Sequence, residues 1–212
     1  MSFSNINLRS FDNSKYDVNN FYLTETIQTS KYILYSVSNI QEQLPLLKTT
    51  DVTVQNIVYN PWMMQLRIDN KNELKMIQQI DNLIVKLVET KSKSILGDDF
   101  TCDEIYNENV FISSLSNNVI LNVVSLKKEN NDIANIPTFN LYEPSRYIIN
   151  NDRLVMNVVC RCALNPWMIQ VFTKTRRFRI LWLVDQCMIL EEPVNFNCIL
   201  DAEDDDEQVQ PV

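Results

Sequence analysis

Histidine is absent from this chain of 212 residues, and glycine occurs only once, at Gly97. Without histidine the chain lacks the commonest general base and the commonest metal ligand, which disfavours most hydrolase mechanisms. A single glycine also excludes phosphate-binding loops of the Walker and dinucleotide types, because both need several residues without a Cβ. We therefore expect no enzymatic activity, no cofactor and no bound metal.

Long apolar runs are missing as well. No segment approaches the roughly 18 to 20 apolar residues that a membrane helix needs, and the N-terminus lacks the basic-then-apolar pattern of a signal peptide. Hydrophobic residues make up 45% of the chain, which is enough for one sizeable core. The sequence therefore predicts a soluble, intracellular protein that is not secreted.

The cysteines are few and scattered. There are five of them: Cys102, Cys160, Cys162, Cys187 and Cys198. Their odd number favours reduced thiols over a disulfide framework. On a strand, Cys160 and Cys162 would point to the same face, but two thiolates do not complete a tetrahedral zinc site. We interpret this pair as core residues rather than metal ligands.

The formal net charge of −8 is unevenly distributed along the chain. Six of the 27 carboxylates lie in residues 201–212, namely Asp201, Glu203, Asp204, Asp205, Asp206 and Glu207. Residues 146–182 carry seven basic side chains against the single Asp152. These two regions predict surfaces of opposite sign.

Hydrophobic periodicity predicts a mainly β protein with one long inserted α-helix. The helix covers residues 71–91, with Asn70 as its cap, Glu73 completing a capping-box-like pair and Gly97 just beyond its end. Strands are expected at residues 31–37, 52–58, 63–68, 110–115, 119–126, 153–164, 167–173 and 178–190. Asparagine pairs such as Asn117 and Asn118 are expected to make turns in place of glycine, and residues 127–147 are expected to form a long loop.

A six-residue motif occurs twice. Residues 60–65 read NPWMMQ and residues 165–170 read NPWMIQ. Each copy is expected to begin a strand, where proline is tolerated. The tryptophans of the motif, Trp62 and Trp167, either pack the ends of a barrel or contact a ligand, and the sequence favours neither interpretation.

Cations and aromatic rings alternate in residues 172–179, which read FTKTRRFR. This mixture suits single-stranded nucleic acid, because cations neutralise phosphates and flat rings accept unstacked bases. A solvated hairpin end is the alternative. Near such a groove, a flexible acidic tail would compete with DNA at high effective concentration and engage other proteins once DNA displaces it, although acidic ends can also be merely solubilising.

The order of elements resembles the compact single-stranded DNA-binding proteins of podophages. The similarity covers residues 54–207: MMQLRIDNKNEL runs into the helix, and RLVMNVVCRCALNPW and FRILWLVDQCMILEE precede the acidic tail. The poxvirus single-stranded DNA-binding protein has a similar beginning and end. The resemblance implies an oligonucleotide-binding (OB) β-barrel over residues 31–200, after an N-terminal arm at 1–30 and before a disordered tail at 201–212.

The resemblance also implies a function. We expect the protein to coat single-stranded DNA without sequence specificity during viral DNA replication or recombination, in the host nucleus or at a viral replication site. The expected partners are single-stranded DNA, viral replication proteins that bind the tail, and further copies of the chain in a homodimer or a higher assembly on DNA. The expected phosphate contacts are Arg161, Lys174, Arg176, Arg177 and Arg179, and the expected stacking residues are Trp62, Trp167, Phe172, Phe178 and Trp182.

Three alternatives stay open on the sequence alone. Phe178 and Trp182 share strand parity with Ile180 and Val184, so both could be core residues. A viral structural or assembly protein could use the same barrel for protein–protein contacts. A nuclease could hold magnesium with carboxylates after the helix, namely Asp98, Asp99, Asp103 and Glu104, although a solvated cluster is the simpler interpretation.

Overall fold

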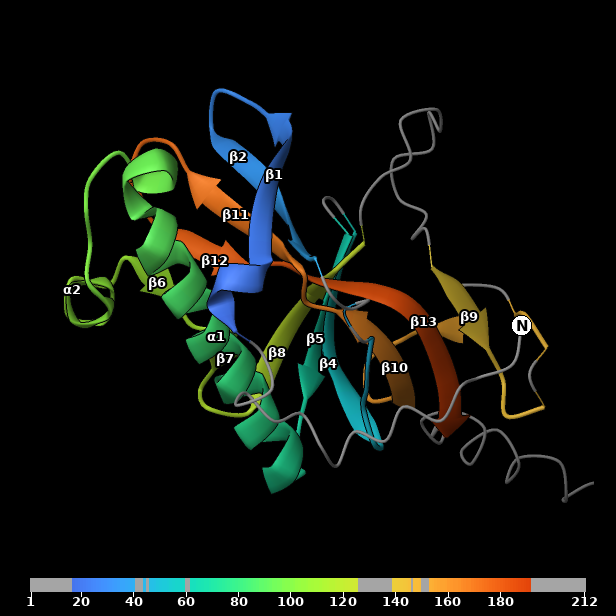
Figure 1. Ribbon diagram of the computed structural model, residues 1–212. Helices are drawn as coiled ribbons and strands as arrows, with labels where there is room; N and C mark the ends of the chain where they lie inside the picture. The colour runs from blue at the N-terminus through green and yellow to red at the C-terminus, as the bar shows by residue number, and fades with distance from the viewer. Residues whose placement is uncertain are drawn as a thin grey trace, which may run out of the picture.

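The structure is a computed structural model that describes residues 17–40, 44, 46–59, 62–125, 139–145, 147–149 and 153–191. Five strands of this part form a closed ring (Figure 1). They are β4 (Val52–Tyr59), β5 (Trp62–Arg67), β8 (Ile120–Val124), β13 (Trp182–Glu191) and β10 (Val159–Asn165). All neighbours in the ring are antiparallel except β8 and β13, which are parallel. This connectivity is that of an OB-type barrel, and it confirms the predicted fold class.

The connection between β10 and β13 is elaborated into a hairpin of β11 (Met168–Phe172) and β12 (Phe178–Ile180). This hairpin joins a second, five-stranded sheet with β1 (Phe21–Gln28), β2 (Tyr32–Asn39) and β6 (Phe111–Ile112), in the order β1-β2-β11-β12-β6. Residues 21–28 of the N-terminal arm expected at residues 1–30 thus form a strand that pairs with β2, with one register shift between Glu25 and Ile27. Residues 1–16 lie outside the described part.

Three short strands of the described part pair with strands of the barrel. They are β3 (Leu47–Lys48) beside β10, β7 (Leu115–Ser116) beside β8, and β9 (Asn140–Tyr142) beside β13. Strand β9 falls inside the loop expected at residues 127–147, of which residues 127–138 and 146 are not described. The strand expected from residue 153 begins only at Val159, after a turn in which Asn157 adopts a φ of 65°.

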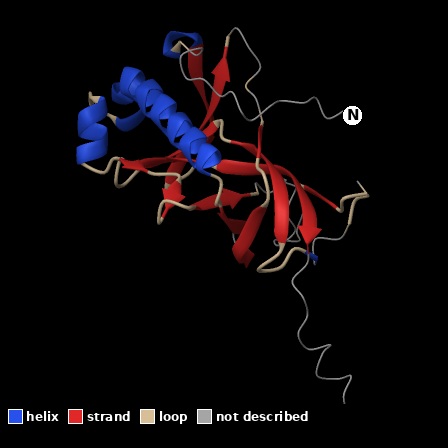
Figure 2. Cartoon of the chain, turned by 90° about the horizontal axis from the view of Figure 1, so that it is seen from below, coloured by secondary structure: helices blue, strands red, loops and turns tan. Residues whose placement is uncertain are grey.

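The long helix α1 (Lys71–Leu96) is inserted between β5 and β8 and packs on one side of the strands (Figure 2). Asn70 caps it by accepting from the Asn72 N–H, and it ends at Gly97, whose φ of 87° is left-handed. The capping-box role expected for Glu73 is wrong, because this side chain is buried and accepts from the Thr50 N–H instead. A one-turn 3-10 helix (Val18–Asn20) precedes β1, and α2 (Cys102–Asn107) follows α1. Among the described residues no helix is long and apolar enough to span a membrane.

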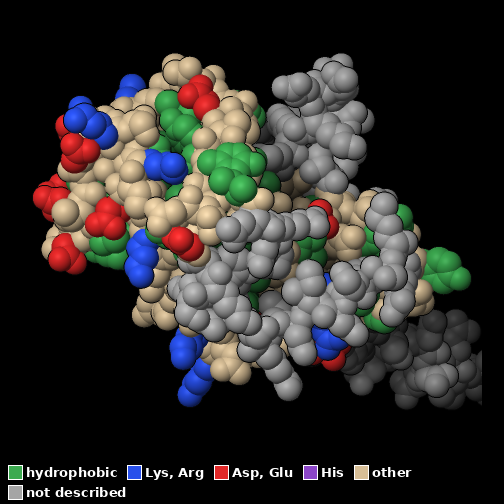
Figure 3. Space-filling model, in the orientation of Figure 1, with side chains coloured by type: hydrophobic (Ala, Val, Ile, Leu, Met, Phe, Trp, Pro, Cys, Tyr) green, Lys and Arg blue, Asp and Glu red, His purple; other side chains and the backbone are tan. Residues whose placement is uncertain are grey.

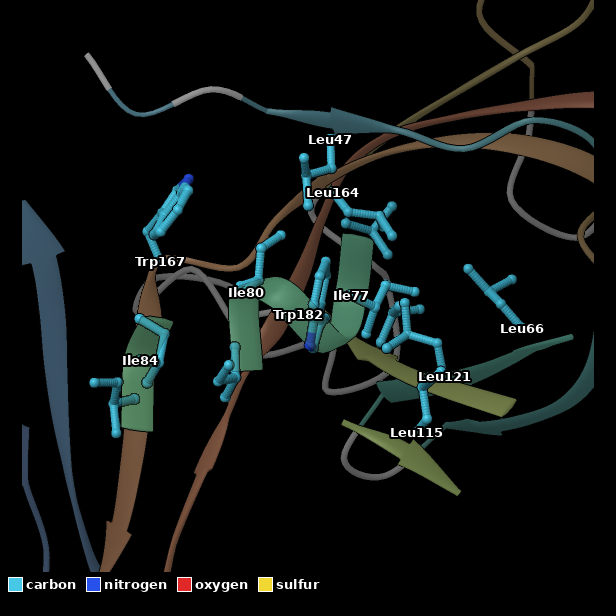
Figure 4. Packing of buried hydrophobic residues seen from close by; sticks show 14 of the residues in the cluster. Leu47, Leu66, Ile77, Ile80, Ile84, Leu115, Leu121, Leu164, Trp167 and Trp182 are labelled. Atoms are coloured by element: carbon cyan, nitrogen blue, oxygen red, sulfur yellow. The ribbon is translucent and has the colours of Figure 1, made fainter. Parts of the chain in front are cut away.

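The core lies between α1 and both sheets. Figure 4 shows Ile77, Ile80 and Ile84 of α1 in one cluster with Trp182 of β13 and residues of β8 and β10. Trp182 is 1% exposed and is among the largest buried side chains. Burial of one isoleucine side chain of α1 contributes roughly 1.5 to 3 kcal/mol to the free energy of folding. The helix is therefore held mainly by its apolar face.

One polar network crosses this core. The Trp182 Nε1–H donates to Ser114 Oγ at 2.7 Å, and the Ser114 hydroxyl donates in turn to Asp81 Oδ1 on α1. The Ser114 backbone N–H donates to Asp81 Oδ2 at 3.1 Å. Burial raises the pKa of Asp81 to about 6 despite these hydrogen bonds. The network fixes the helix relative to β13 and the segment before β7.

The raised pKa of Asp81 makes stability depend on pH. Because the folded pKa of about 6 exceeds the ordinary value of 3.8, the folded state binds this proton more tightly than the unfolded chain does. The protonated Asp81 side chain therefore makes its full contribution to the free energy of unfolding below about pH 4. This contribution is lost as pH rises through about 6, a change of about 3 kcal/mol. Urea unfolding of the native protein and of Asp81→Asn should be measured across this pH range. The native protein should lose stability relative to the variant as pH rises, whereas parallel profiles would refute the raised pKa of Asp81.

Candidate nucleic-acid interface

The β11–β12 hairpin ends in a well-fixed turn at residues 173–177. The Phe172 N–H donates to the Arg177 carbonyl at 2.8 Å, and the Arg176 N–H donates to the Phe172 carbonyl at 2.9 Å. Arg176 itself adopts a φ of 54°. These contacts close the turn and leave residues 173–177 exposed.

The β1–β2 turn packs beside this hairpin. Thr173 donates from its N–H to the Lys31 carbonyl and from its hydroxyl to the Ser30 carbonyl, both at 3.1 Å. Lys31 is exposed. The backbone contact therefore brings a cation from the N-terminal part of the chain next to the hairpin. We call the resulting set the basic tip: Lys31, Lys174, Arg176, Arg177 and Arg179.

The arginines of the basic tip differ in their partners. Arg176 forms an exposed ion pair with Asp98. Arg177 donates from Nε to the Asn109 carbonyl at 2.9 Å. Lys174 is exposed and has no hydrogen bond or ion pair within the described residues. Figure 3 shows acidic and basic side chains interspersed at the α2 end of the molecule, so carboxylates lie among the cations there.

Arg179 has a more protected environment. Its Nε donates to Gln170 Oε1 at 2.8 Å, and its guanidinium carbon lies 5.6 Å from the centre of the Phe172 ring. Burial lowers the pKa of Arg179 from its usual value. A cation over a ring face is attracted by the ring quadrupole, so the pair is held in place without a carboxylate.

Two rings accompany the basic tip. Phe172 is paired across strands with Tyr32, and both are partly exposed. Strand alternation places Phe172 and Arg179 on the opposite face of the sheet from Ile169, Val171 and Phe178, which are buried. Gln170 shares the face of Arg179 but is itself only 8% exposed. The structure thus places one predicted ring beside the predicted cations, together with a tyrosine that sequence reasoning missed.

Three of the predicted stacking residues are buried. Phe178 is 0% exposed and packs against Phe111 at 5.2 Å between ring centres. Trp182 is 1% exposed, and Trp167 is 5% exposed and packs against Phe21 at 6.5 Å. The stacking roles predicted for them are wrong in this structure, because no face of these rings is open to a base.

The two copies of the Asn-Pro-Trp motif lie at corresponding places in the barrel. The first copy spans the β4–β5 connection and the second begins the β10–β13 connection, the two loops with which OB barrels commonly bind oligonucleotides. In the second copy, Asn165 Oδ1 accepts from the Trp167 N–H at 3.0 Å and turns the chain out of β10. Asn60, Pro61 and the side chain of Trp62 lie outside the described part.

Arg161 lies apart from the basic tip. It projects from the middle of β10, opposite Met188, and pairs with Asp51 at 2.6 Å. Of the five cations expected to contact phosphate, Arg161 is thus the one that does not join the hairpin group. Arg161 belongs to the outer wall of the barrel, and the acidic residues 201–207 lie outside the described residues. The DNA contacts themselves stay predictions.

The carboxylates of the nuclease alternative do not converge. Asp98 pairs with Arg176, Asp99 pairs with Lys93 at 3.5 Å, and Glu104 accepts from the Thr101 N–H at the start of α2. Within the described part of the chain, the one group of three or more potential ligand side chains consists of cysteines. The arrangement therefore gives no support to a magnesium site at these residues.

The chain is similar in structure to phage single-stranded DNA-binding proteins. The protein of bacteriophage Enc34 in a C-terminally truncated form covers 81% of this chain and 96% of its own length, with 8% identity and a TM-score of 0.44. Bacteriophage T7 gp2.5 covers 78% and 98%, with 9% identity and a TM-score of 0.43. The Enc34 protein in complex with single-stranded DNA covers 81% and 96%, with 11% identity and a TM-score of 0.41.

No protein-family model and no curated protein matches the chain. The solved structures belong to the class of phage proteins that the order of elements resembles. The similarity to the poxvirus protein stays a prediction. The assignment of the barrel itself follows from the strand connectivity described above.

Proposed function

We propose that this protein binds single-stranded DNA without sequence specificity and coats it during viral DNA replication and recombination. The supporting observation is the basic tip with Phe172 and Tyr32, which the β10–β13 connection of an OB-type barrel and the adjoining β1–β2 turn carry together. The β10–β13 connection is one of the loops through which such barrels commonly contact oligonucleotides.

The chemistry of the basic tip suits a strand without base-pairing partners. Its five cations offer contacts to successive phosphates, and Phe172 with Tyr32 offers ring faces to unstacked bases. A hollow of about 420 Å³ beside the tip, bordered by Arg177, Asn109 and Tyr106, gives room next to these contacts. Contacts to phosphates and stacking on rings do not read the edges of the bases. This supports binding that tolerates any sequence.

The acidic tail fits the same proposal. Its carboxylates would compete with DNA for the basic tip and would become free to engage viral replication proteins when DNA binds. The proposal includes no covalent chemistry and no cofactor. It places the protein at the viral replication site, where several copies would line one strand.

A second candidate function has one specific observation in its favour. Three apolar side chains around β9 and before β10 are strongly exposed: Tyr147 at 72%, Ile148 at 67% and Met156 at 56%. Contiguous exposed apolar patches mark protein–protein contacts, so these side chains would favour a role in virion structure or assembly if they form one such patch. If the protein without residues 201–212 does not bind oligonucleotides at low salt, the proposed DNA binding is excluded and only this second function remains.

Neutralising the exposed cations of the basic tip should weaken binding to all sequences alike. In the triple variant Lys174→Gln, Arg176→Gln and Arg177→Gln, the slope of log affinity against log salt should fall by about 2, because each phosphate contact contributes about 0.7. Fluorescence anisotropy with oligo(dT), oligo(dC) and mixed sequences measures this. The matched control neutralises three exposed lysines of α1: Lys71, Lys75 and Lys86. An equal loss in the control would show that net charge alone matters.

Removing a ring of the tip should act differently from removing a charge. Phe172→Leu, and separately Tyr32→Leu, should each cost about 1 to 3 kcal/mol of binding free energy with an unchanged salt slope, because a stacked base is lost but no phosphate contact. Trp182→Phe is the contrasting variant: it should lower the free energy of unfolding by removing the donor to Ser114, and leave DNA affinity unchanged. If Phe172→Leu instead lowers the slope of log affinity against log salt, its affinity loss reflects a lost phosphate contact, and stacking at Phe172 is disproved.

Deletion of residues 201–212 should raise affinity for single-stranded DNA, most strongly at low salt. The deletion removes the tethered carboxylates that compete for the tip, and salt screens that competition. The control deletes only residues 208–212, which carry no charged side chain. Equal affinity of the full chain and both truncations, measured in the same anisotropy titration, would exclude competition by the tail.

A further inference from the structure

Three cysteine sulfurs meet inside the barrel. Cys160 and Cys162 share one face of β10, and Cys187 of β13 is the direct cross-strand partner of Cys162. The sulfur of Cys162 lies 3.8 Å from that of Cys160 and 3.7 Å from that of Cys187, and all three lie within 4.8 Å of one another. All three side chains are buried, with 2% exposure or less. The sequence pattern indicated only the first two.

These distances suit a single bound ion. Metal–thiolate bonds are about 2.3 Å long, so three sulfurs around one centre lie about 3.8 to 4.0 Å apart. A small inward shift of Cys187 toward Cys160 would complete that triangle. The sulfurs come from two adjacent strands that pair without a break from Cys160 with Ile189 to Ala163 with Gln186, so their backbone positions are fixed before any ion arrives.

The donor set selects the class of ion. Calcium and magnesium need oxygen ligands. Structural zinc is almost always four-coordinate, and the group formed by the described residues contains three sulfurs and no carboxylate. Soft thiolate ligands favour Cu(I), a monovalent ion that three sulfurs can satisfy without water.

We propose that Cys160, Cys162 and Cys187 form a three-coordinate thiolate site for one Cu(I) ion. Binding releases the thiol protons to solvent and leaves an anionic cluster. A surface hollow of about 230 Å³, bordered by Cys162 and Cys187, is also bordered by Lys48 and Arg161. This hollow lies on the surface beside two of the three cysteines.

The site would link the two strands that close the barrel. The ion joins β10 to β13 at the centre of their pairing, so it stabilises the folded state, to which alone it binds in this geometry. The inference is independent of DNA binding, since the cysteines face the barrel interior and the basic tip lies on the hairpin. Either can fail without the other.

The test is an anaerobic titration of the full, reduced chain with Cu(I) supplied as its acetonitrile complex. The expected result is one tightly held ion per chain, sulfur-only three-coordination in the X-ray absorption spectrum, and a higher Tm. Cys187→Ala should weaken Cu(I) binding by more than roughly tenfold, since even outer-sphere changes at metal sites cost that much. The control, Cys102→Ser with Cys198→Ser, keeps the three buried thiols and should bind Cu(I) as the native chain does.

Several results would overturn the proposal. They are tight binding that survives Cys187→Ala, binding lost in the control, oxygen or nitrogen ligands in the absorption spectrum, and Zn²⁺ bound as tightly as Cu(I). A Cys162–Cys187 disulfide in protein purified under reducing conditions would also overturn it. Because the absorption spectrum is recorded on the native chain, the proposal stays testable even if Cys187→Ala does not fold.

Discussion

The antiparallel pairing of β10 with β13 is the interaction on which the rest of the structure depends. Seven residue pairs, from Val159 with Glu191 to Asn165 with Leu183, join these strands and close the ring. The same pairing fixes where the chain must leave the barrel and return to it. Residues 166–181 therefore emerge as one excursion from a rigid base, and the β11–β12 hairpin within it is held by the second sheet on both sides.

Strand alternation then divides the aromatic residues between core and surface. In β11 and β12, Ile169, Val171, Phe178 and Ile180 lie on the buried face of the sheet. Phe172 and Arg179 lie on the other face and are partly exposed. The sequence FTKTRRFR thus places its two phenylalanines on opposite sides of one sheet. Composition alone predicts that both rings contact a ligand. The register between the two strands instead puts Phe178 in the core and Phe172 on the surface.

Local signals in the sequence were sufficient for much of the fold. Asn70 and Gly97 bracket α1 because a cap and a left-handed residue act within a few residues. Asn117 and Asn118, with φ of 51° and 61°, make the turn expected of them. The nonlocal features were not accessible: Lys31 reaches the tip through a backbone contact with Thr173, and the partners Asp51 and Asp98 of Arg161 and Arg176 lie 110 and 78 residues away in sequence. No periodicity or composition encodes those distances.

The ion pair between Arg176 and Asp98 does not oppose a role of the basic tip in binding. Both side chains are 57% exposed, and exposed pairs contribute about 0 to 1 kcal/mol. A phosphate that replaced Asp98 would therefore have little attraction to overcome. Arg179 is held by Gln170 and Phe172, a neutral amide and a ring, so neither of these contacts neutralises its charge. A guanidinium that is already held, as that of Arg179 is, would lose less side-chain freedom on binding a phosphate than a free one would.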